Sequence, residues 1–125
     1  MKRKLIVITL AVMMLASLVA CGGKKDVLSK FEDELKSRNI AYEKIETAAA
    51  MIGAEKGVKF LIGDGRVEVY VFDKSSEAYK TAEKNQKISL AGFGEFPALI
   101  TGGVAMMVED LDTATYEAIL RSVLD

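Results

Sequence analysis

The side chains that could perform chemistry in this sequence are few, and two common types are almost missing. The chain has no histidine, and its only cysteine is Cys21. Histidine is the usual general base of nucleophilic catalysis and the most frequent metal ligand. Its absence excludes Ser–His and Cys–His arrangements, so only carboxylates, lysines, tyrosines and hydroxyls remain for catalysis.

Two of the carboxylates, Glu46 and Glu68, could form the acid and base pair that hydrolysis requires. No spacing in the sequence brings them together, and Glu68 fits the polar face of a strand equally well. A small hydrolase that depends on carboxylates is therefore kept as an alternative function, and we assign no catalytic residue.

A second acidic group consists of Asp64, in the triplet GDG, and of Glu109, Asp110 and Asp112. Calcium prefers such oxygen ligands, but IGDGRVE lacks the alternating ligands and the closing glutamate of a calcium loop. EDLD is explained by a helix cap with negative charge near a helix N-terminus. GDG and GFG do not complete a phosphate-binding motif. We therefore expect no metal and no cofactor.

Two aromatic residues, Phe93 and Phe96, flank a glycine in the segment 92–97, which holds the only proline of the chain. Exposed aromatic side chains on a loop are typical anchors for a protein partner. Alternatively, the two rings fold back under the sheet as part of the core. Phe93 and Phe96 are the candidate partner-contact residues.

The N-terminus has the organisation of a secretory signal peptide. Lys2, Arg3 and Lys4 are followed by sixteen uncharged residues, from Leu5 to Ala20. Sixteen residues are too few for a typical spanning helix, which needs about 20, but they fit the apolar region of a signal peptide.

The end of this apolar region, Leu18-Val19-Ala20-Cys21, resembles the lipobox of bacterial lipoproteins. The resemblance implies export, attachment of a diacylglyceryl group to Cys21, and cleavage between Ala20 and Cys21. It also implies a cell-membrane protein anchored by lipid on the extracytoplasmic face, because two acyl chains hold a protein stably in a bilayer. Cys21 would then be an attachment point and not a redox or catalytic group.

This interpretation divides the chain into a signal peptide at 1–20, a lipidated cysteine with a short tether at 21–25, and one domain at 26–125. Loss of three basic residues with the signal peptide changes the formal net charge from −1 to about −4. Such a charge disfavours nucleic acid as a partner. The mature part is also too short for the two lobes of a solute receptor.

The clearest local structure is a pair of hairpins. In GVKFLIGDGRVEVYVFD, apolar residues alternate on both sides of GDG, which predicts two strands. An Asp64-Gly65 turn would pair Ile62 with Val67, Phe60 with Val69 and Val58 with Val71, placing the aliphatic side chains on one face. In ALITGGVAMMV, a Gly102-Gly103 turn would pair Thr101 with Val104, Ile100 with Ala105 and Leu99 with Met106. These strands are apolar on both faces, which predicts cover on both sides.

Helices are expected around these hairpins. Asp26, Asp73 and Asp112 are predicted N-caps, and ETAAAMIGAEKG is predicted to form a short helix that ends near Gly53 or Gly57. The last helix is expected to bury Tyr116, Ile119, Leu120, Val123 and Leu124. The whole predicts an α+β domain with an antiparallel sheet of about four strands, in two hairpins, with helices packed on it.

The segments GAEKGVKF, GRVEVYVFD and EAYKTAEK resemble small lipoproteins of unknown function in Gram-positive bacteria. That resemblance supplies no catalytic residue. With the lipobox, it favours a non-enzymatic binding or accessory module of the cell envelope. Its expected partners are the bilayer, through acylated Cys21, and another envelope protein. The alternative is a small cell-envelope hydrolase that uses carboxylates.

Overall fold

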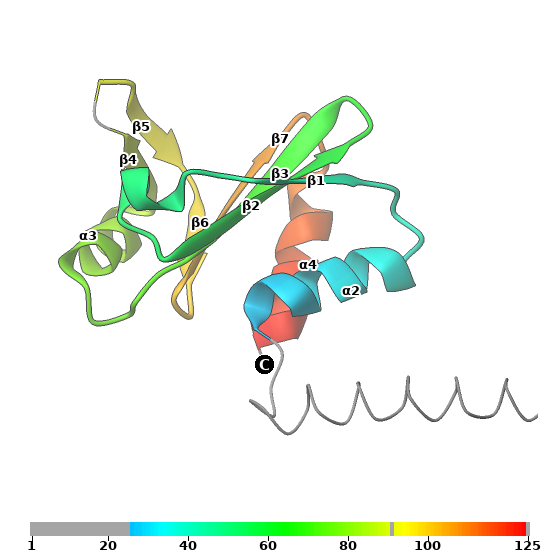
Figure 1. Ribbon diagram of the computed structural model, residues 1–125, viewed down its shortest axis with the longest axis horizontal. Helices are drawn as coiled ribbons and strands as arrows, with labels where there is room; N and C mark the ends of the chain where they lie inside the picture. The colour runs from blue at the N-terminus through cyan, green and yellow to red at the C-terminus, as the bar shows by residue number, and fades with distance from the viewer. Residues whose placement is uncertain (1–25, 91, 125) are drawn as a thin grey trace, which may run out of the picture.

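The structure of the chain is a computed structural model that describes residues 26–90 and 92–124 (Figure 1). The helices are α2 (Val27–Ser37), the 3₁₀ helix η1 (Ala49–Ile52), α3 (Glu77–Asn85) and α4 (Thr113–Leu124). The strands are β1 (Glu43–Glu46), β2 (Lys56–Ile62), β3 (Gly65–Val71), β4 (Lys87–Leu90), β5 (Gly94–Pro97), β6 (Leu99–Thr101) and β7 (Val104–Glu109). The predicted signal peptide and tether, including Ala20 and Cys21, lie outside the described residues.

Within the described part of the chain, five strands form one antiparallel sheet in the order β1-β2-β3-β7-β6. Strands β4 and β5 form a separate antiparallel pair. The predicted α+β class with an antiparallel sheet is confirmed. The predicted number of about four strands was too low, because β1 and the β4–β5 pair add strands outside the two predicted hairpins.

The turn of the first hairpin lies one residue earlier than predicted. The observed pairs are Ile62–Gly65, Phe60–Val67, Val58–Val69 and Lys56–Val71. The Asp64-Gly65 turn was therefore wrong, together with its pairs Ile62–Val67, Phe60–Val69 and Val58–Val71. The turn residues are Gly63 and Asp64, and only Gly63 has a positive φ, +57°. Since the partner shifts by two residues, the predicted core face is unchanged.

The second hairpin has the predicted register. Gly102 and Gly103 both have positive φ, and the pairs are Thr101–Val104, Ile100–Ala105 and Leu99–Met106. Ala105 and Met106, which point to opposite faces of β7, are both buried. The middle of β7 is thus covered on both sides, as its composition predicted.

Helices α2 and α4 lie beside each other and cover one face of the five-stranded sheet (Figure 1). Their apolar stripes recur at three- and four-residue steps, so each helix turns one face to the sheet. The residues buried in this core are Phe31, Leu35, Val58, Phe60, Ile62, Val67, Val69, Val104, Met106, Tyr116, Ile119, Leu120 and Val123. The predicted buried face of α4 is confirmed, with Leu124 partly buried.

The opposite face of the sheet is covered only in part. Helices η1 and α3 and the β4–β5 pair gather at the end of the sheet away from α2 and α4 (Figure 1). They form a smaller core around Tyr70, Phe72, Tyr79, Ile88, Ile100 and Ala105. The remainder of this face, on β2, β3 and β7, borders open space.

The helix caps agree with the sequence at some positions and not at others. The Asp26 side chain accepts a hydrogen bond from the Ser29 amide and caps α2, as predicted. Gly53, with φ of +80°, ends η1. Asp73 was wrong as the cap of α3, because Ser76 accepts from the Tyr79 amide at that position. Asp73 instead accepts two hydrogen bonds from Ser75 in the preceding turn.

The side chain of Gln86 pairs with the backbone of β6 as a neighbouring strand would. Its Nε2 donates to the Ile100 carbonyl at 2.9 Å, and its Oε1 accepts from the Ile100 amide at 3.0 Å. Nε2 also donates to the Glu83 carbonyl at 2.8 Å. Gln86 thereby joins the end of α3 to β6, the edge strand of the main sheet. Without Gln86, the backbone N–H and C=O groups of Ile100 on this edge would have no partner strand to pair with.

Replacement of Gln86 by glutamate should lower the free energy of unfolding by about 1–3 kcal/mol. The carboxylate cannot donate to the two carbonyl oxygens, and each lost hydrogen bond contributes about 0.5–1.5 kcal/mol. Urea denaturation should be compared with that of Asn85→Asp, which introduces the same charge at the exposed neighbouring position. Equal losses in the two variants would mean that the charge, and not the lost hydrogen bonds, is responsible.

Candidate binding cleft

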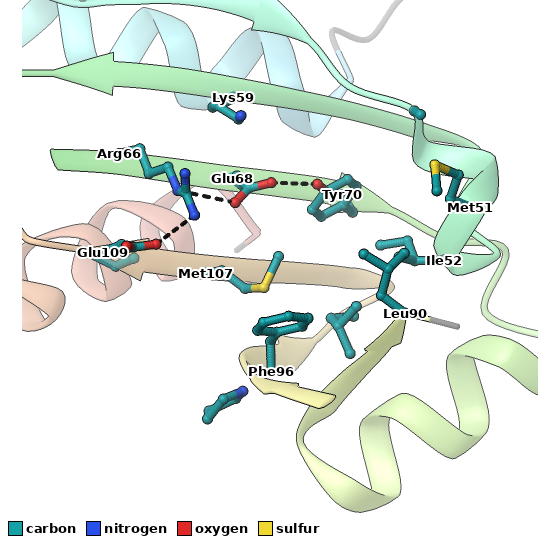
Figure 2. A pocket seen from close by; sticks show the side chains of 14 residues that line it. Met51, Ile52, Lys59, Arg66, Glu68, Tyr70, Leu90, Phe96, Met107 and Glu109 are labelled. Carbon is teal, nitrogen blue, oxygen red and sulfur yellow. Dashed lines mark hydrogen bonds and ion pairs between the residues drawn. The ribbon is translucent and has the colours of Figure 1, made fainter. Parts of the chain in front are cut away.

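The uncovered part of the sheet forms the floor of a cleft with a volume of about 440 Å³. This volume is within the range of pockets that bind small ligands. Figure 2 shows its lining side chains, which come from β2, β3 and β7 of the main sheet, from η1 and from the β4–β5 pair. The cleft has one apolar end and one charged end.

Met51, Ile52, Leu90, Phe96 and Met107 form the apolar end (Figure 2). Leu90 and Phe96 come from the two strands of the β4–β5 pair, and the pairing of Leu90 with Gly94 and of Ile88 with Phe96 places them on one face. Met51 is 61% exposed and Phe96 is 41% exposed. The apolar end is therefore open to solvent.

Arg66 organises the charged end through two carboxylates. Its Nη2 lies 2.6 Å from Glu109 Oε2, and its Nε lies 3.5 Å from Glu68 Oε2. Strand pairing sets this arrangement, because Arg66 lies opposite Glu109 on the neighbouring strand β7. Glu68 follows Arg66 by two residues along β3, so both point to the cleft.

Tyr70 closes this network on the side toward the apolar end (Figure 2). Its hydroxyl donates a hydrogen bond to Glu68 Oε1 at 2.7 Å. Burial, followed by the hydrogen bond to Glu68, raises the pKa of Tyr70 to about 12. The phenol therefore keeps its proton at neutral pH and acts as a donor that orients Glu68.

Lys59 lies on β2 directly opposite Glu68 and also lines the cleft. In the range 26–90 and 92–124, the Lys59 ammonium has no ion pair and no hydrogen bond to protein. The buried Nε of Arg66 likewise lacks a hydrogen-bond acceptor, since its approach to Glu68 does not have hydrogen-bond geometry. Of these two groups, Lys59 lines the cleft without a charged partner, whereas Arg66 Nε is buried beside Glu68.

The structure separates the roles of the two candidate partner-contact residues. Phe93 is 71% exposed at the tip of the β4–β5 pair, between Gly92 and Gly94, which both have positive φ. Phe96 lies in β5, and its ring lines the cleft (Figure 2). Neither ring is buried in the core, so the alternative of two core rings is wrong. The predicted loop at 92–97 was also wrong in part, because Gly94–Pro97 is a strand.

The two carboxylates considered for hydrolysis do not converge. Glu68 points to the cleft, whereas Glu46 pairs with Val58, whose side chain faces the core under α2 and α4. Glu46 and Glu68 therefore lie on opposite faces of the sheet. In the part of the chain that the structure describes, no three Asp or Glu side chains are grouped as a metal ion would need.

Most of the cleft was not predicted from the sequence. The predicted Asp64-Gly65 turn would place Leu61 opposite Glu68 and Lys59 opposite Tyr70, whereas the structure places Lys59 opposite Glu68 and Leu61 opposite Arg66. The alternation of Arg66, Glu68 and Tyr70 along β3 was the available signal, because three polar or amphipathic side chains share one face there. Met51 and Met107 carried no signal of their own.

Among the described residues, no helix combines the length and the apolar character that crossing a membrane demands. Comparisons of the chain with protein-family models, with curated proteins and with solved structures found no match.

Proposed function

We propose that this chain is a membrane-anchored extracytoplasmic lipoprotein that acts as a non-enzymatic binding or accessory module of the cell envelope. Lipid on Cys21 would hold the domain at the bilayer. The cleft and the exposed tip of the β4–β5 pair would form the contact surface for another envelope protein.

The observation that carries the binding part of this proposal is the grouping of exposed apolar side chains around one cleft. Exposed large apolar residues are usually scattered on a protein surface, and their concentration favours an interaction site. Ile45, Met51, Phe93 and Phe96 are the large apolar residues with the greatest exposure in the described part. Met51 and Phe96 line the cleft, and Phe93 lies on the same hairpin as Phe96.

The position of this surface is compatible with an anchor at Cys21. Helix α2 starts at Val27, close to the predicted tether, and the β4–β5 pair lies at the other end of the molecule (Figure 1). A domain tethered through its N-terminus can therefore direct Phe93 and Phe96 away from its attachment point. That orientation suits a partner that approaches from the periplasmic or external side.

The double replacement Phe93→Ala and Phe96→Ala should weaken partner crosslinking in intact cells with little loss of stability. Both rings are more than a third exposed, and surface replacements usually change the free energy of unfolding by about 0.5 kcal/mol or less each. The measurements are crosslinking followed by identification of the attached protein, and a thermal melt of the purified variant.

Ile45→Ala provides a matched control, because Ile45 is exposed to a similar degree as Phe96 but does not line the cleft. It should leave the crosslinking yield unchanged. A loss of stability well above about 1 kcal/mol in the double variant would show that the rings support the fold. Undiminished crosslinking would contradict the proposed contact surface.

A further inference from the structure

The Lys59 ammonium is a cation without an acceptor at the charged end of the cleft. Lys59 Nζ has no ion pair and no hydrogen bond in the described part, whereas Arg66 Nε is buried next to Glu68 Oε2, with which it forms an ion pair. The oxygens of Glu68 are already engaged by Tyr70 and Arg66, and Glu109 is engaged by Arg66. The group that this site lacks is therefore an acceptor, and a carboxylate would satisfy an ammonium most strongly.

The apolar end of the cleft indicates the size of the apolar part of the ligand that carries this acceptor. It is short and open, since Met51 and Phe96 at its mouth are both more than a third exposed and the whole cleft measures about 440 Å³. A long alkyl chain would remain mostly in water there, whereas one or two apolar amino-acid side chains would be covered. Met51 and Met107 are flexible enough to adapt to different side chains.

We propose that the cleft binds the carboxyl-terminal end of a peptide chain whose last residues are apolar. The terminal carboxylate would accept from the Lys59 ammonium, and the last side chain would lie between Phe96 and Met107. This inference rests on the proposed function, because it specifies which part of a partner protein enters the cleft.

The methionine methyl groups provide a direct test. The full-length chain, labelled with ¹³C at its methionine methyl groups and placed in phospholipid nanodiscs, is titrated with N-acetyl-Leu-Phe. The signals of Met51 and Met107 should shift and saturate. The signal of Met106 should stay in place, because Met106, unlike its neighbour Met107 on β7, points into the core on the opposite face of the sheet.

The role of the terminal carboxylate is tested with a matched ligand and a matched variant. N-acetyl-Leu-Phe amide has the same apolar body without the carboxylate, and it should bind about tenfold more weakly. Lys59→Gln should weaken binding of the acid about tenfold and leave binding of the amide unchanged. Lys80→Gln removes the same charge from the exposed surface of α3 and should change neither affinity.

Three outcomes would overturn the inference. These are an absence of shifts at Met51 and Met107 at about 1 mM peptide, equal affinities for the acid and the amide, and tighter binding of decanoate than of N-acetyl-Leu-Phe. The last outcome would assign the cleft to a fatty acid. None of them depends on the crosslinking of Phe93 and Phe96, so the contact surface can survive when the peptide-end assignment fails.

Discussion

Replacement of Phe60 by alanine should lower the free energy of unfolding by about 3–5 kcal/mol. Phe60 is completely buried at the centre of the core between the sheet and helices α2 and α4. Its ring centroid lies 5.6 Å from that of Phe31 and 5.4 Å from that of Tyr42, which meets it edge to face. The replacement removes these contacts and leaves a cavity. The sheet on one side and helices α2 and α4 on the other cannot move together to fill it.

Urea denaturation of residues 22–125, followed by circular dichroism, measures this loss. Lys59→Ala is the matched control, because Lys59 is the preceding residue on β2 and points to the cleft on the other face. It should change the free energy of unfolding by no more than about 0.5 kcal/mol. Equal losses for the two variants would contradict the assignment of faces on this strand.

That assignment of faces was accessible from the sequence, whereas the register was not. Alternation with a period of two residues decides which side chains of β2 and β3 point to the core. A shift of the partner strand by two residues preserves the alternation, and the observed hairpin differs from the predicted one by this amount. Core residues such as Phe60 and Val67 were therefore predicted correctly with the wrong partners.

The register depends on a contact that is distant in the sequence. In the triplet Gly63-Asp64-Gly65, an Asp-Gly turn is locally favourable, and we chose it for that reason. In the structure, Gly65 belongs to β3, and a Cβ atom there would lie 2.5 Å from the backbone oxygen of Glu109 and 2.6 Å from that of Asp110. Gly65 is thus a glycine because β7 ends against it, which leaves Gly63 and Asp64 as the turn.

The β4–β5 pair shows a different limit of sequence analysis. In β4, Ile88 and Leu90 alternate with polar residues over only four positions, and in β5, Gly94 and Pro97 are residues that strands usually avoid. Pro97 is tolerated because β5 is an edge strand of a two-stranded sheet. Phe96 has the extended conformation of β5, which is the conformation that a following proline favours.

The cleft itself could not be predicted, because its lining residues belong to elements that meet only in the folded chain. Residues from 48 to 109 contribute to it, through η1, three strands of the main sheet and the β4–β5 pair. Of this set, Phe96 was named as a candidate contact residue, and Glu68 was named for a role that its position does not support. The ion pairs of Arg66 depend on the alignment of β3 with β7, which no local pattern specifies.

Replacement of Cys21 by serine should abolish attachment of fatty acid and cleavage between Ala20 and Cys21. Metabolic labelling with a fatty-acid analogue should mark the wild-type chain and not the variant, since a hydroxyl does not replace the thiol in the thioether bond. The variant should also retain its first 20 residues, which mass spectrometry of the intact protein detects. Ser17→Ala leaves Leu18-Val19-Ala20-Cys21 unchanged and should be labelled normally.

The position of the fatty-acid label in the chain is a second and sharper test of the anchor at Cys21. Asp26 caps α2 and pairs with Lys56 at 3.3 Å, and the four residues 22–25 between it and Cys21 can span about 14 Å at most. Trypsin should release the acyl groups on the short peptide from Cys21 to Lys24. Undiminished labelling of Cys21→Ser, or a label on any other peptide, would contradict the anchor and with it the placement of the domain at a membrane surface.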